Sequence, residues 1–98
     1  MHIVVSWDIS ATGSRWTEID DQLKAQLEGF SWVRPLKTVY VVKVHSVSHR
    51  DELINNLQNV AKNTSETLHF LASPPMTGGS YNGWLPQDLW DKIRERAN

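Results

Sequence analysis

Apolar and polar residues alternate along the chain in blocks that predict strands and helices in turn. Residues 2–9 form a short apolar run rich in β-branched side chains, which is typical of a strand buried on both faces. From Trp16 onward, apolar residues recur at steps of three and four, as on the buried stripe of a helix. These residues are Ile19, Leu23, Leu27 and Phe30. We expect Ser14 to cap this helix and Gly29 to end it.

A second block of β structure occupies residues 31–44. It is interrupted by Pro35, which cannot donate a hydrogen bond to a sheet. We therefore expect a short strand at residues 32–34 and a longer one from Lys37, whose side chains alternate between two faces. The residues expected on one face are Leu36, Thr38, Tyr40, Val42 and Val44.

The second half of the chain predicts a helix, a strand and another helix. Ser48 is expected to begin a helix that ends near residues 63–65, and the apolar residues 67–72 predict a strand. The Pro- and Gly-rich residues 74–80 cannot continue that strand and predict a loop. Pro86 suits the first turn of a last helix. The residues of this helix expected to face inward are Leu89, Trp90 and Ile93.

The resulting order, β-α-β-β-α-β followed by a helix, predicts one α+β domain over residues 1–98. It fits the ferredoxin-like split β-α-β sandwich with an extra C-terminal helix. In that plan, the helices lie on one face of the sheet and the other face carries none. In a chain with five tryptophans, such an uncovered face is a natural surface for a symmetric dimer.

Composition narrows the range of partners and sites. The chain is 40% hydrophobic and 21% charged, and its formal net charge of −1 gives no general attraction for nucleic acid. It has no cysteine, which excludes disulfides and thiolate metal sites. No apolar run approaches the ~20 residues that span a bilayer, and the first residues lack the basic-then-apolar pattern of a signal peptide. We therefore expect a cytoplasmic protein that does not enter the membrane.

Asp8 is the first candidate for chemistry, because it directly follows an apolar run. It is either a metal ligand or a turn residue whose carboxylate caps the amides of residues 10–12. Arg15 is either a phosphate contact or an exposed arginine at the start of a helix. Arg34 and Lys37 belong to a modest basic strip, which is either solvated surface or the one local field able to attract a nucleic acid.

For several other polar features, the sequence favours a structural role. His45 and His49 are separated by a strand–helix junction and have no further ligands at a useful spacing, so a zinc site is not expected. His69 is interpreted as a sheet histidine whose hydrogen bonds are satisfied. The Gly78-Gly79 pair lacks the context of a phosphate-binding loop, and we interpret it as a mobile connection or an arm that contacts a second copy.

A set of short motifs in this chain also occurs in a known family. They are the Trp7-Asp8 pair, Trp32, the Leu36-x-Thr38-x-Tyr40 pattern and Gly83-Trp84. In layout, nearly the whole chain resembles the SinR-like proteins, which group with VapD and the small CRISPR adaptation nuclease in one ferredoxin-like superfamily. The resemblance implies a homodimer. It also implies a role for Asp8, because some members bind a catalytic metal through the aspartate that ends the first strand of each subunit.

The first class of function implied by the resemblance is a Mg²⁺-dependent endonuclease with RNA as the expected substrate. Asp8 from each chain would be the catalytic metal ligand, and the metal would activate a water and hold the scissile phosphate. The residues expected to bind RNA or DNA are Arg15, Arg34 and Lys37.

The second class is a catalytically inactive dimer that binds a protein or nucleic acid partner, in a toxin–antitoxin or mobile-element setting. The single acid near the first turn and the slightly acidic net charge favour this class, whereas the position of Asp8 favours the nuclease. The residues expected at the dimer interface are Trp32, Tyr40 and Trp84.

Overall fold

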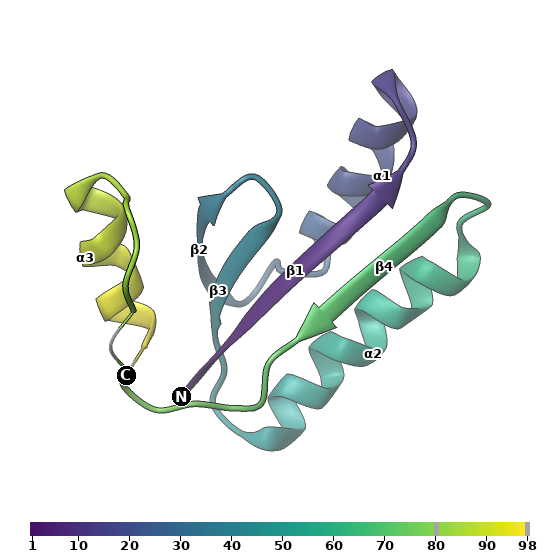
Figure 1. Ribbon diagram of the computed structural model, residues 1–98. Helices are drawn as coiled ribbons and strands as arrows, with labels where there is room; N and C mark the ends of the chain where they lie inside the picture. The colour runs from purple at the N-terminus through teal and green to yellow at the C-terminus, as the bar shows by residue number, and fades with distance from the viewer. Residues whose placement is uncertain (80, 98) are drawn as a thin grey trace.

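A four-stranded antiparallel sheet and three helices make up the fold within residues 1–79 and 81–97, which the computed structural model describes (Figure 1). The elements are β1 (His2–Ser10), α1 (Gly13–Ala25), β2 (Ser31–Leu36), β3 (Val39–Lys43), α2 (Val47–Asn63), β4 (Thr67–Ala72) and α3 (Gln87–Arg96). The strands lie in the order β2-β3-β1-β4, and neighbouring strands are antiparallel. The α+β class expected from the sequence is confirmed. In this described part of the chain, no helix is long and apolar enough to cross a membrane.

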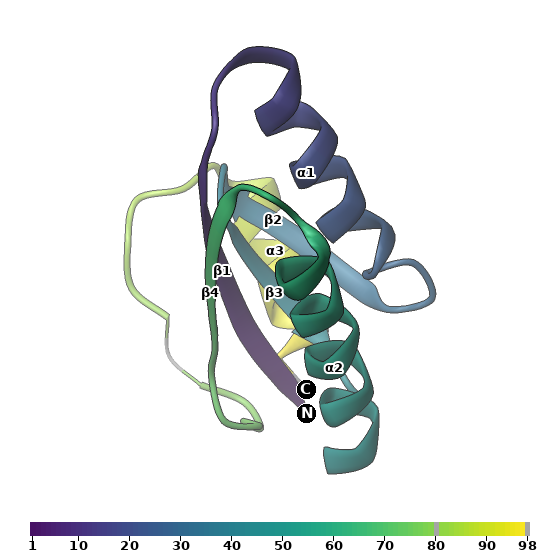
Figure 2. The same cartoon turned by 90° about the vertical axis from the view of Figure 1, so that its right-hand side faces the viewer.

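β1 lies in the middle of the sheet and pairs with two strands. Its residue Val5 faces Tyr40 on β3 and Ala72 on β4. Figure 2 shows α1 and α2 on the same face of the sheet. Alternate side chains of β1 point to opposite faces, and one set is buried in the main core with residues of these two helices. This buried set is Ile3, Val5, Trp7 and Ile9. β1 therefore contributes to both faces of the sheet.

α3 packs on the opposite face, against β2 and β3, so the expectation that this face carries no helix is wrong. Ile93 of α3 is buried with Val33 and Val41, and Leu89 and Trp90 pack around them, as their spacing predicted. The physical reason is that Val33 and Val41 point away from the main core, so this part of the second face is apolar and favours a cover. Figure 1 shows α3 beside β2, away from α2. The other half of this face, formed by β1 and β4, is exposed at most of its positions.

The starts of two helices differ from the expected ones. Ser14 was expected to cap α1, but it lies inside the first turn and Thr12 holds the cap position. α2 begins before Ser48, because the hydroxyl of Ser46 accepts a hydrogen bond of 3.0 Å from the backbone N–H of His49. The local hydrogen bond thus moves the start of α2 toward the preceding strand.

Asp20 is a buried carboxylate that joins three elements of the fold. Its Oδ1 accepts a hydrogen bond of 3.0 Å from the indole N–H of Trp7 on β1. Its Oδ2 lies 3.6 Å from the ammonium of Lys24 and 3.7 Å from the guanidinium of Arg34 on β2. Two cations therefore balance one buried negative charge, which would otherwise be costly to remove from water.

Tyr40 fills the main core between two tryptophans. Its ring stacks on Trp7 at a centroid distance of 4.5 Å and meets Trp32 edge to face at 5.3 Å. The guanidinium of Arg34 lies 5.3 Å from the Tyr40 ring centroid, in cation–π contact. Burial raises the pKa of the Tyr40 phenol to about 12, so the ring stays neutral near physiological pH.

Replacing Asp20 with alanine is expected to lower the free energy of unfolding by about 2–3 kcal/mol, because the Trp7 N–H loses its acceptor and the Arg34 guanidinium loses its carboxylate counter-ion. Denaturant unfolding followed by circular dichroism measures this change. The matched control is Asp21→Ala, which removes a carboxylate that is 62% exposed and pairs with Lys24 at 3.3 Å. The control should lose less than about 1 kcal/mol, and equal losses in the two variants would contradict the role given to Asp20.

Candidate functional site

Asp8 lies on an open part of the sheet and does not end a strand. β1 continues beyond it, because Ile9 and Ser10 still pair with β4. The position at the end of the first strand, which the resemblance implies for Asp8, is therefore wrong, and β1 extends one residue beyond the expected range of 2–9. Since Trp7 and Ile9 point into the main core, the exposed side chain of Asp8 points to the opposite face. The carboxylate therefore stands on the surface of the sheet.

His69 on β4 is the cross-strand neighbour of Asp8, and both residues are exposed. Directly opposed residues of an antiparallel pair have Cβ atoms about 4.5–5.5 Å apart, so the carboxylate and the imidazole are close neighbours. They line a shallow hollow of about 400 Å³, together with Ser6, Thr38 and Leu71. The hollow thus combines an acid, an imidazole and two hydroxyl groups with an exposed apolar side chain.

One copy of the chain offers an incomplete metal site at this hollow. The described residues contain no group of three or more His, Asp or Glu side chains that could hold a metal ion. Mg²⁺ is usually bound by one or two carboxylates, with water at its other positions. Each copy supplies one carboxylate through Asp8, so two copies together would supply the two carboxylates that a Mg²⁺ site can use.

Arg15 is held in a cluster of ion pairs at the start of α1. Its Nε lies 3.0 Å from Glu66, its Nη1 lies 3.0 Å from Glu18, and its Nη2 donates a hydrogen bond of 3.3 Å to the hydroxyl of Thr64. The hydrogen bond with Glu66, followed by that with Glu18, raises the pKa of Arg15 above its usual value. The side chain connects α1 to the loop before β4, and it would have to leave these partners to bind a phosphate.

Arg34 and Lys37 pack on the α1 side of the sheet, away from Asp8. The Nε of Arg34 donates a hydrogen bond of 2.7 Å to the backbone carbonyl of Lys37, and its guanidinium lies near Asp20. The Lys37 ammonium lies 4.7 Å from the ring centroid of Trp16 on α1. Because Asp8 points to the other face, the structure does not bring it together with these two expected substrate-binding residues.

Trp84 offers the largest free surface of the three aromatic residues expected at a dimer interface. It is 99% exposed. Trp32 is half-buried against the main core, and Tyr40 has no exposed area. The contribution of Tyr40 is therefore to the core of its own chain, and the segment before α3 presents the exposed ring of Trp84.

The two histidines at the start of α2 form a stack of aromatic rings. The rings of His45 and His49 are 5.0 Å apart and nearly parallel, and His49 also stacks on Phe30 at 4.2 Å. The backbone N–H of His45 donates a hydrogen bond of 3.0 Å to Nδ1 of His49. This hydrogen bond uses the Nδ1 lone pair that a metal would need, and it fixes the junction between β3 and α2.

Residues 76–78 join the start of β1 to the end of α3. His2 and Met76 exchange two backbone hydrogen bonds of 2.8 and 2.9 Å, and the N–H of Gly78 donates to the carbonyl of Ala97 at 2.6 Å. The hydroxyl of Tyr81 forms a hydrogen bond with Nε2 of His2, which has no exposed area. Because the Gly78 amide is used within the chain, it is not free to bind a phosphate. Sequence reasoning missed His2, whose one signal was a polar residue in a strand expected to be buried.

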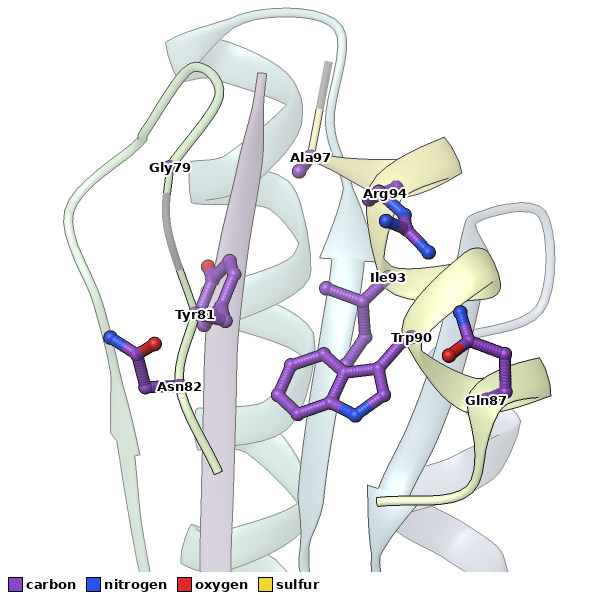
Figure 3. Close-up of a pocket in the computed structure, with 8 residues that line it drawn as sticks. All are labelled: Gly79, Tyr81, Asn82, Gln87, Trp90, Ile93, Arg94 and Ala97. Atoms are coloured by element: carbon purple, nitrogen blue, oxygen red, sulfur yellow. The ribbon is translucent and has the colours of Figure 1, made fainter. Parts of the chain in front are cut away.

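Two cavities lie between α3 and the segment before it. The first, of about 400 Å³, has a polar rim that includes Asn82, Gln87 and Arg94. Figure 3 shows Trp90 and Ile93 extending from α3 toward this cavity. The second, of about 250 Å³, we call the apolar cavity. Its lining includes Val39, Val41, Leu36, Leu85, Trp84 and Trp90.

Comparison with known protein families, with curated proteins and with solved structures found no match to this chain.

His2 is expected to make the stability of the fold depend on pH. Burial lowers the pKa of His2 below its usual value of 6.5, so the unfolded chain takes up a proton at a higher pH than the folded chain does. The stabilisation from neutral His2 is present above about pH 6.5 and is lost as the pH falls below it, with a limiting slope of about 1.4 kcal/mol per pH unit.

Denaturant unfolding at a series of pH values between about 7.5 and 5 measures this slope. The comparison is with His2→Gln, which keeps a polar side chain but does not titrate in this range. The variant should lose the component of the slope that begins near pH 6.5. The same pH dependence in both proteins would show that other groups cause it.

Proposed function

We propose that this chain is a homodimeric binding module with a ferredoxin-like fold, similar to the SinR-like proteins and acting in the cytoplasm. The connection β-α-β-β-α-β and the strand order β2-β3-β1-β4 support this fold assignment. The resemblance implies that its partner belongs to a toxin–antitoxin system or to a mobile element. The binding role itself rests on the exposed surface before α3.

The observation that carries the proposal is an apolar surface around the mouth of the apolar cavity. We call it the Trp84 patch, and it consists of Pro35, Leu36, Val39, Trp84 and Leu85. Trp84 is 99% exposed and Leu36 is 57% exposed. Contiguous exposed apolar surface marks interaction sites on proteins, and tryptophan is enriched among the residues that contribute most to binding. A partner that covers this patch would remove it from water.

A Mg²⁺-dependent endoribonuclease is the second candidate, favoured by the exposure of Asp8 on the uncovered half of the sheet. The ion would be shared between Asp8 of two copies, since each copy supplies one carboxylate at this hollow. When bound, Mg²⁺ would lower the pKa of a water and stabilise charge on the phosphate. Against this candidate, Arg34 and Lys37 lie on the other side of the sheet, and Arg15 is engaged by Glu18 and Glu66.

A cleavage assay separates the two candidates. For a binding module, purified protein should leave labelled single-stranded RNA intact in the presence of Mg²⁺. For the nuclease, wild type should cleave with Mg²⁺ but not with EDTA, and Asp8→Asn should be slower by a factor of about 100 or more. The control is Asp21→Asn, an exposed carboxylate on α1, which should behave as wild type. Cleavage with this pattern would overturn the proposal of an inactive module.

The dimer is tested by sedimentation equilibrium at micromolar concentrations. The expected mass at high concentration is twice the 11.2 kDa of one chain. A mass of one chain throughout the concentration range would contradict the homodimeric part of the proposal.

A further inference from the structure

We propose that two copies of this chain dimerise by exchanging Trp84, so that the indole of each copy enters the apolar cavity of the other. This inference rests on the proposed homodimer and assigns its contact surface. It makes Trp84 the central contact of the dimer and the apolar cavity its binding site.

Trp84 is the projecting part of this contact. Its side chain is almost wholly exposed, whereas its neighbour Leu85 packs against the cluster of Val33, Val41 and Ile93. The packing of Leu85 fixes the backbone next to Trp84 and leaves the indole outside the fold. An exposed tryptophan leaves a large apolar area in water, and burying such a ring removes about 150–250 Å² from solvent.

The apolar cavity is the receiving part. Its volume is about 250 Å³, whereas a dry apolar cavity of about 150 Å³ in another protein is large enough to bind benzene. The space is therefore large enough for an indole ring. None of the residues that line it carries a formal charge at neutral pH. A second copy can therefore approach without bringing like charges together at the contact.

The occupant is a second copy because the same patch contains both the projecting ring and the hollow. In a twofold dimer, both subunits use the same surface, so this surface must be complementary to itself. A patch with Trp84 at the rim of its own apolar cavity meets this condition. The contact of two rings with two cavities is small compared with a standard interface of about 1,600 Å². We therefore expect a dissociation constant in the micromolar range.

Sedimentation equilibrium of the full chain, over concentrations from about 1 to 500 µM, tests the exchange. Trp84→Ala removes the projecting ring, and Val39→Phe fills the cavity with a side chain that favours a strand. Each variant alone should dimerise at least tenfold more weakly than wild type. The matched control is Val47→Ala, which removes a 55% exposed apolar side chain at the start of α2, outside both the apolar cavity and the Asp8 hollow, and should dimerise as wild type does.

Mixing the two variants gives a second, independent readout. The Trp84→Ala chain keeps an open cavity and the Val39→Phe chain keeps its indole, so one of the two contacts can form in a mixed dimer. The mixture should therefore associate more tightly than either variant alone and more weakly than wild type. Circular dichroism confirms folding of each variant. Because Trp84 is almost fully exposed, its replacement keeps the test valid even if Val39→Phe does not fold.

Each result has a definite consequence. If Trp84→Ala dimerises as tightly as wild type, the exchange is wrong while the proposed homodimer stands. If wild type stays monomeric up to the highest concentration, both the exchange and the homodimer are wrong. If both variants fold and their mixture gains no association, the reciprocal contact is wrong.

Discussion

The rest of the structure depends on one constraint, which is that successive side chains of the central strand β1 point to opposite faces of the sheet. Trp7 points into the main core, where it donates to Asp20, and Asp8 therefore points to the open face. Pairing with β4 then places Asp8 opposite His69. A shift of one residue would move the main-core side chains of β1, which are Ile3, Val5, Trp7 and Ile9, to the opposite face. The same alternation that forms the core thus decides which polar side chains reach the surface.

Several charged residues of this chain connect its elements, and the clearest unused surface is apolar. Arg34 balances the buried charge of Asp20, and Arg15 connects α1 to the loop before β4. The guanidinium groups of both residues are already engaged within the chain, so neither is free to bind a phosphate. Trp84 is the contrasting case, because its side chain has almost no contact with its own fold. A role in recognition accounts for this exposed ring more directly than a role in folding does.

The strands and helices could be predicted because each has its own periodic pattern, and the apolar run at 67–72 matches β4 residue for residue. The packing of α3 on the second face of the sheet could not be predicted in the same way. Val33 and Val41 form an apolar surface on that face only because β2 and β3 are paired, and local sequence does not show this pairing. The candidate site also combines a residue that local sequence could predict with one that it could not. Asp8 could be singled out by its place after an apolar run, but its neighbour His69 is set by strand pairing across 61 residues (69 − 8), which local spacing does not encode.

The hydrogen bonds of residues 76–78 with His2 and Ala97 also bear on how the chain is made. Within this chain, β1 is synthesised well before its partner β4 and before residues 76–78, which close over its start. β1 can therefore pair with β3 during synthesis, but its other edge remains unpaired until β4 has been made. Because the pairing of β1 with β4 is late and long-range, it slows folding. Until it forms, the apolar residues and the unpaired edge of β1 are exposed to aggregation, from which chaperones can protect them.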